Sequence, residues 1–251
     1  ARAPYPQDNE WLLSSSEDSL IRLWNLSART SVCAYRSSAE SRHPIWDVAC
    51  NPLGYYFASA SHDRTATLWC TEYASPLRRF VGHLSDVDTV RFHPNGSMIA
   101  TGSLDRTVRL WDARSGGCVR VFGLAHQQGG GGSQSGGGGG GGHLGGVTAL
   151  AFSPNGQFLV SGGQDTQLCV WDLQAGKMLT SVPWAGRGEL GKGNGFARTH
   201  STPEVRSLEF SMDGTVLASA TTDHVVRCWD AALFHRWQAE VENEEEEGDE
   251  E

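Results

Sequence analysis

The sequence predicts an all-β protein made of small antiparallel sheets that repeat along its 251 residues. In five places a tryptophan follows an aspartate by six residues. These pairs are Asp18 and Trp24, Asp63 and Trp69, Asp105 and Trp111, Asp165 and Trp171, and Asp223 and Trp229. Apolar and polar residues alternate around each aspartate, as they do in two strands joined by a tight turn. A repeat of about 40–45 residues with such marks predicts a β-propeller in which each repeat forms one blade.

The first repeat is expected to be incomplete. It contains a predicted strand from Trp11 to Ser16, a turn at Glu17-Asp18 and a second strand from Leu20 to Leu26. Residues 1–10 are polar and carry no repeat pattern, so we expect a disordered lead. The chain is therefore expected to enter the propeller in the middle of a blade.

The next four repeats each show an inner strand, a glycine-containing turn and further strands. The third repeat, from Gly82 to Asp112, is the most regular, with two alternating runs around the turn Pro94-Asn95-Gly96. Elsewhere the predicted strands are 45–50, 55–60 and 65–69, then 147–152, 158–161 and 167–171, then 205–210, 216–220 and 225–229. Outer edge strands are expected at 78–81 and 118–122, and a last one from Phe234 to Val241.

Two glycine-rich segments interrupt the repeat. They cover residues 127–142 and 185–199, and both fall between the outer strand of one blade and the inner strand of the next. Glycine-rich segments behave as flexible coil, so we expect loop insertions there. The predicted propeller therefore spans residues 11–239, with residues 240–251 as a tail.

Charge is concentrated in that tail. The net charge is −9, and residues 240–251 contain nine acids and no base, which leaves 20 acidic and 20 basic residues in the rest. A neutral body argues against a protein that binds DNA phosphates, so no direct sequence-specific nucleic-acid binding is expected. The tail cannot bury enough apolar surface to fold by itself and is expected to be disordered.

The six cysteines are scattered without a CxxC pair, which predicts reduced thiols and neither a metal site nor a cofactor. Cys169 and Cys228 precede Trp171 and Trp229 within predicted strands, where a small buried side chain belongs. No apolar run approaches the length of a membrane span, and no apolar signal core is present. We expect no membrane partner.

His83, Ser103 and Asp105 look like the base, nucleophile and carboxylate of a hydrolase. Partial versions of the same set recur in the other repeats, which favours a structural role over catalysis, and we expect no enzyme. The repeats resemble the WD40 family. In that family a histidine, a Ser or Thr two residues before the aspartate, the aspartate and the tryptophan form a hydrogen-bonded network within each blade. The resemblance implies such a network for His83, Ser103, Asp105 and Trp111.

The other repeats depart from this pattern. The first and second keep the hydroxyl, aspartate and tryptophan but lack the histidine: Ser16, Asp18 and Trp24, then Ser61, Asp63 and Trp69, with Ser41 at the histidine position and His43 displaced by two. In the fourth, Gly163 replaces the hydroxyl beside His143, Asp165 and Trp171. In the fifth, His200 is offset by one residue from the pattern of Thr221, Asp223 and Trp229.

Segments outside the repeat pattern give a narrower resemblance. They are Pro52–Phe57 with His62–Arg64, Pro76–His83, Asp86–Pro94 and Gly117–Phe122. These segments resemble the WD-repeat subunit of the general transcription factor TFIID and its counterpart in SAGA-type coactivators. The resemblance covers about residues 11–230. It implies a seven-bladed nuclear scaffold, of which this chain holds about five recognisable blades, that packs against histone-fold subunits in RNA polymerase II transcription. We interpret the chain as part of a longer protein.

Two alternatives remain open. Trp111-Asp112-Ala113-Arg114 resembles the WDxR box of substrate receptors for cullin-4 ubiquitin ligases. A reader of histone tails would instead need an acidic, aromatic-lined pocket. Exposed aromatic residues on a propeller would be its binding hot spots, and the candidates are Trp46, Tyr55, Tyr56 and Trp184.

Overall fold

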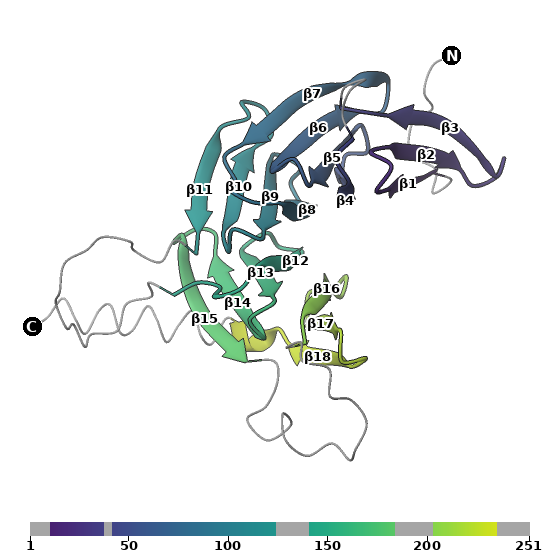
Figure 1. Cartoon of the computed structure of the whole chain (residues 1–251). Helices are drawn as coiled ribbons and strands as arrows, with labels where there is room; N and C mark the ends of the chain where they lie inside the picture. Colours follow the sequence, from purple (N-terminus) through teal and green to yellow (C-terminus); the bar gives the residue numbers. More distant parts are fainter. Residues whose placement is uncertain (1–10, 38–41, 124–140, 184–202, 235–251) are drawn as a thin grey trace, which may run out of the picture. The chain divides into compact units, whose positions relative to one another are not determined.

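A computed structural model describes residues 11–37, 42–123, 141–183 and 203–234. The chain divides between Val121 and Phe122 into two compact units. The described strands form five antiparallel sheets of three or four strands (Figure 1), and within the described residues helix is found only at 232–234. The all-β prediction is confirmed, and the sheets fit the blades of a β-propeller.

The first unit contains three sheets. The strands of the first are β1 (Trp11–Ser15), β2 (Ile21–Asn25) and β3 (Thr30–Tyr35). The second is formed by β4 (Ile45–Cys50), β5 (Tyr56–Ser61), β6 (Thr65–Cys70) and β7 (Tyr73–Val81). The third is formed by β8 (Val87–Phe92), β9 (Met98–Ser103), β10 (Val108–Asp112) and β11 (Cys118–Phe122), and the boundary between the units falls within β11. The outer strand β7 is five residues longer at its start than predicted.

The second unit contains two sheets. The strands of the first are β12 (Val147–Phe152), β13 (Phe158–Gly163), β14 (Gln167–Asp172) and β15 (Lys177–Pro183). The other is formed by β16 (Val205–Phe210), β17 (Val216–Thr221) and β18 (Val226–Asp230). The prediction of a strand starting at Phe234 is wrong at that residue, which lies in a helical turn at 232–234. The Asp230 carboxylate accepts a hydrogen bond from the N–H of Ala232 (2.9 Å), and the Ala231 carbonyl accepts one from the N–H of Phe234 (3.0 Å), which together start the turn.

The aspartate that marks each repeat makes the tight turn between the two middle strands. In all five repeats its carboxylate accepts a hydrogen bond from the backbone N–H two residues later. The residue between them has a positive φ in every repeat: Ser19, Arg64, Arg106, Thr166 and His224. A left-handed backbone conformation is costly for a residue other than glycine. The hydrogen bond to the aspartate side chain offsets this cost and stabilises the turn.

Apolar side chains of neighbouring sheets form the core of each unit. In the first unit, one cluster joins the first and second sheets around Tyr35, Phe57 and Trp69, and another joins the second and third around Phe80 and Trp111. In the second unit, Phe158, Leu208, Leu217 and Phe234 belong to one cluster. Burial of these faces against the next sheet is what stabilises a repeat protein. Within the described residues, no helix has the length and apolar character needed to cross a membrane.

The first glycine-rich segment leaves and re-enters the second unit at one place. A Cβ atom added to Gly142 would lie 2.4 Å from the Cα atom of Gly123. The last residue of the segment is therefore in close backbone contact with Gly123, the last described residue before it. The rest of this segment, all of the second one and the tail lie outside the described residues.

Candidate functional site

The third sheet contains a buried series of hydrogen bonds that links β9, β10, the turn between them and the segment before β8. Trp111 on β10 donates from Nε1 to the Thr101 hydroxyl on β9 over 2.8 Å. The same hydroxyl lies 2.7 Å from Nε2 of His83, and Nδ1 of His83 lies 2.9 Å from Oδ2 of Asp105. Thr107 donates from its hydroxyl to Oδ1 of Asp105 over 2.6 Å. A single histidine thus connects the indole of one strand to the aspartate of the turn.

The positions of the protons in this network follow from which groups donate and which accept. The Thr101 hydroxyl accepts from Trp111, so it has its own proton to donate to Nε2 of His83. Nδ1 of His83 then carries the proton that it donates to Asp105. Burial by itself raises the pKa of Asp105, but hydrogen bonds from His83, Thr107 and the N–H of Leu84 outweigh it and hold this pKa well below its usual value. Asp105 is therefore a carboxylate.

The fourth sheet repeats this arrangement. Trp171 donates to the Ser161 hydroxyl over 2.8 Å, and Ser161 lies 2.7 Å from Nε2 of His143. Nδ1 of His143 lies 2.9 Å from Oδ2 of Asp165, which also accepts from the N–H of Leu144. Burial raises the pKa of Asp165, and the stronger effect of His143 and the backbone donors lowers it overall.

In the four repeats that have a hydroxyl two residues before the aspartate, the prediction that this hydroxyl meets the tryptophan is wrong. The hydroxyl that meets the tryptophan lies ten residues before it, as in Thr101 and Ser161, and not two residues before the aspartate. Ser103 lies two residues beyond Thr101, about 7 Å further along the strand and out of reach of the indole. Its hydroxyl donates to the carbonyl of Ser85 and accepts from the N–H of Asp105.

The same correction applies elsewhere. The indoles of Trp24, Trp69 and Trp229 donate to Ser14, Ser59 and Ser219, each at 2.9 Å, and not to Ser16, Ser61 or Thr221. Gly163 corresponds to Ser103, so it does not break the fourth network. Its missing side chain leaves room for the carbonyl oxygen of Gly146, 2.6 Å from where a Cβ atom would lie. A hydroxyl ten residues before each of the five tryptophans was the available signal in the sequence.

In the remaining sheets an arginine contacts the aspartate of the turn. Arg79 on β7 reaches Oδ2 of Asp63 over 2.7 Å, and Arg22 on β2 reaches Oδ2 of Asp18 over 2.6 Å. Arg227 on β18 lies 3.4 Å from Oδ2 of Asp223. His43 is exposed and lies 6.0 Å from the ring of His62, away from Asp63. Ser41 and His200 lie outside the described residues.

The network in the third sheet is closed to substrates. The His83 and Asp105 side chains are 1 % and 5 % exposed, and the Thr101 and Ser103 residues are fully buried. Every polar side-chain atom of this hydrogen-bond network already has a partner within the blade, as buried polar groups require. The geometry therefore supports cross-linking of strands and offers no nucleophile to a ligand.

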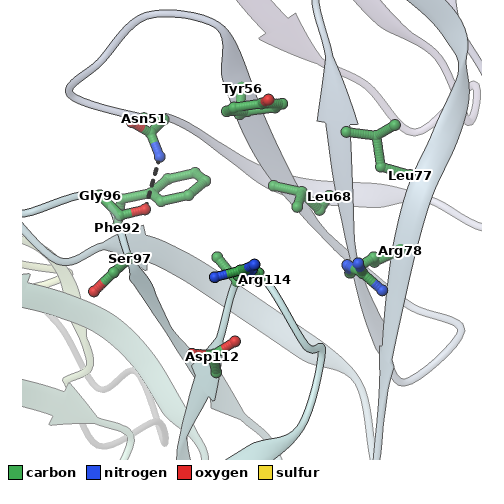
Figure 2. A pocket seen from close by; sticks show the side chains of 11 residues that line it. Asn51, Tyr56, Leu68, Leu77, Arg78, Phe92, Gly96, Ser97, Asp112 and Arg114 are labelled. Atoms are coloured by element: carbon green, nitrogen blue, oxygen red, sulfur yellow. Dashed lines mark hydrogen bonds between the residues drawn. The ribbon is translucent and has the colours of Figure 1, made fainter.

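An open cleft lies at the end of the second and third sheets in the first unit (Figure 2). Its volume is about 520 Å³, and its walls include the buried side chains of Leu68 and Phe92 and the exposed side chains of Tyr56 and Leu77. Asn51 also lines the cleft and donates to the carbonyl of Gly96 over 3.0 Å. The cleft thus combines apolar walls with polar and charged side chains.

Two arginines give this cleft its charge. Arg78 on β7 and Arg114 in the turn after β10 line it and are exposed, and neither is in an ion pair with a residue in the described ranges. Gly116, with φ of 78°, has no side chain, and the Arg78 stem lies against it, 3.6 Å from where a Cβ atom would lie. Asp112 also lines the cleft, but its carboxylate accepts from the N–H of Ser115 over 2.5 Å. Two guanidinium groups and one carboxylate leave a net positive charge.

The equivalent crevice in the second unit is filled by the chain itself. Phe234, from the helical turn after β18, packs against Phe158 and Phe210 with ring centroids 6.2 and 6.1 Å apart and is only 3 % exposed. Spaces of about 140 and 20 Å³ remain around it. Phe234 therefore occupies the part of this crevice that is open in the first unit.

The predicted hot-spot residues are partly accounted for. Trp46, Tyr55 and Tyr56 are 41 %, 38 % and 41 % exposed, and only Tyr56 lines the cleft. Trp184 lies outside the described residues. Cys169 is buried as expected, and burial raises the pKa of its thiol to about 12. The expectation for Cys228 is wrong, since this cysteine on β18 is exposed.

The sequence matches the family model "WD domain, G-beta repeat" at residues 3–25, 34–70, 74–112, 140–172 and 195–230. It is 32 % identical to Transcription initiation factor TFIID subunit 5 of Caenorhabditis elegans over 231 residues, which are 88 % of this chain and 32 % of that protein. It is 30 % identical to the guanine nucleotide-binding protein subunit beta of Solanum tuberosum and of Arabidopsis thaliana, over 89 % of this chain and 54 % of each of those proteins. The chain thus spans about a third to a half of these relatives. By its repeats and its five sheets, the chain belongs to the WD domain, G-beta repeat family.

Proposed function

We propose that this chain is a non-catalytic interaction scaffold of an RNA polymerase II transcription complex of the TFIID or SAGA type, acting in the nucleus. The observation that carries the proposal is its 32 % identity to TFIID subunit 5 across 88 % of its length. The segments outside the repeat pattern, such as Pro52–Phe57 and Asp86–Pro94, support the same assignment. Histone-fold subunits are the proposed partners.

Burial of the only catalytic-looking residues identified in the sequence suits a scaffold. The candidate triad of His83, Ser103 and Asp105 is buried and engaged within the blade, with Ser103 bonded to Ser85 and Asp105. The surface instead offers a cleft with apolar walls and two arginines, which suits protein contacts. A propeller fold alone does not name a partner, so the proposal rests on the relative and not on the fold.

A guanine nucleotide-binding protein subunit beta is the second candidate, because 30 % identity over 89 % of the chain is close to the TFIID match. Purification of the epitope-tagged whole protein from separate nuclear and cytoplasmic fractions, followed by mass spectrometry, distinguishes the two. We expect histone-fold subunits of TFIID or SAGA in the nuclear fraction. Recovery of guanine nucleotide-binding protein subunits, or of a cullin-4 adaptor, in their place would contradict the proposal.

A further inference from the structure

The open cleft and the filled crevice occupy the same place in the repeat. Counting from the tryptophans, Phe92 of the cleft corresponds to Phe210, Gly96 to Gly214 and Ala113 to Ala231, and all three of the latter surround Phe234. Phe234 comes five residues after Trp229, and the residue five after Trp111 is Gly116. The first unit thus has the lining of the crevice without the phenylalanine that fills it.

We infer that the cleft of the first unit binds a large apolar side chain, foremost a phenylalanine, within an acidic segment of a protein partner. This inference rests on the proposed scaffold function and names the chemistry of one partner. The equivalence with Phe234 indicates the apolar side chain. Residues that differ between the two units indicate the acidic flanking residues.

The apolar walls suit a phenyl ring. Leu68 and Phe92 are buried at the back, while Tyr56 and Leu77 are 41 % and 44 % exposed. A ring that enters the cleft would cover the exposed faces of both residues, as Phe234 covers Phe158 in the second unit. Release of water from such an apolar hollow drives binding, and the small number of polar groups around it sets specificity.

The two arginines select the flanking residues. Arg78 pairs with Leu68 across β6 and β7, and the residue in that position of the fourth sheet is Thr180, paired with Val170. Arg114 comes three residues after Trp111, where the fifth sheet has Ala232. Both charges are therefore present only at the open cleft. Guanidinium groups without an ion-pair partner in the described part of the chain bind carboxylates well, and they repel a basic segment.

Selection of random peptides displayed on phage against the purified whole chain tests the inference without assuming a partner sequence. We expect enriched peptides to contain Phe, Leu or Trp with Asp or Glu within a few positions. Fluorescence anisotropy should then show at least a tenfold loss of affinity for Arg78→Glu and for Arg114→Glu. Substitution of the peptide's aromatic residue by alanine should cause a similar loss.

The matched control is Arg36→Glu, an exposed arginine just after β3 and outside the cleft, which should bind the peptide like the native chain. Enrichment of basic peptides, competition by single-stranded DNA at equal charge, or equal binding by native protein and both arginine variants would overturn the inference. Because the selection uses the purified chain, its result is separate from co-purification. If TFIID subunits co-purify but the selection fails, the contact with those subunits lies outside the cleft. If the selection succeeds but TFIID subunits are not recovered, the inference about the cleft stands and the proposed complex is contradicted.

Discussion

The two crevices between neighbouring sheets, one in each unit, are built from equivalent residues and end in different states. In the second unit the chain continues from β18 into a helical turn that buries Phe234 to 3 % exposure. In the first unit the chain after β10 makes a tight turn, in which the N–H of Gly116 donates to the Asp112 carbonyl over 2.8 Å, and the crevice stays open. The strands set the shape of the crevice, and the turn after the third strand decides whether it is available to a partner.

Residues that stabilise the two units are alike, whereas residues that could recognise a partner differ. The buried networks of the third and fourth sheets match in their distances and in their histidine, aspartate and tryptophan members. These parts hold each blade together and recur from one blade to the next. The side chains that differ between the units, Arg78 and Arg114 against Thr180 and Ala232, lie at the surface where binding specificity arises.

The largest expected effect comes from emptying the filled crevice. Phe234→Ala should destabilise the second unit by about 3–5 kcal/mol, because it removes a buried phenyl ring and leaves a cavity. Tyr56→Ala, at the equivalent of Phe158, should cost the first unit only about 1 kcal/mol because its side chain is partly exposed. Hydrogen exchange followed by mass spectrometry reads β17 and β9 separately. Equal protection of β17 in native and Phe234→Ala chains would show that Phe234 does not hold the crevice closed.

The next effect tests the corrected hydroxyl. Thr101→Val keeps the shape of the side chain but leaves the Trp111 N–H and His83 Nε2 without a partner, which should cost about 1–3 kcal/mol. Ser103→Ala loses two bonds to less deeply buried backbone groups of Ser85 and Asp105 and should cost about 1 kcal/mol. Urea unfolding monitored by tryptophan fluorescence measures both. A larger loss for Ser103→Ala than for Thr101→Val would restore the assignment made from the sequence.

Acid should weaken both units in the same way, since each contains one complete network. The pKa values of Asp105 and Asp165 are lower in the folded chain than the ordinary value of about 3.9 for the unfolded chain. The stability they contribute is thus fully present above about pH 4–5 and is lost as pH falls through their folded pKa values. The urea midpoint of each unit should fall as the pH is lowered from 7 to 4 and then to 3. A rise in the midpoint of either unit below pH 4 would contradict the lowered pKa values of Asp105 and Asp165.

The smallest effect is expected in the second sheet. Arg79→Ala removes an ion pair with Asp63 in which the arginine side chain is half exposed, so the loss should be about 0.2–1 kcal/mol. His83→Ala in the third sheet removes a buried partner and should cost several times more. If the two variants lost equal stability in thermal unfolding, arginine would be a full substitute for histidine in this network.

Much of the fold could be predicted from the sequence, because the aspartate and tryptophan of each repeat have a local role at fixed spacing. Asp105 caps its own turn, and Trp111 lies on the strand that follows. The error over Ser103 and Thr101 arose because both lie on the same strand, and alternation alone does not say which one reaches the indole. The cleft could not be predicted, since it depends on two turns distant in sequence and on the path of the chain after Asp112 and Asp230.

Exchange of charge across the cleft is the most direct test of this comparison. The measurement is the affinity of Arg78→Glu/Arg114→Glu for two versions of a selected peptide, one with glutamates and one with lysines around its phenylalanine. The native chain should prefer the glutamate version and the double variant the lysine version, with both preferences lost when phenylalanine is replaced by alanine. Unchanged preference for the glutamate version in the double variant would show that the acidic residues are recognised elsewhere, and would contradict the role given to Arg78 and Arg114.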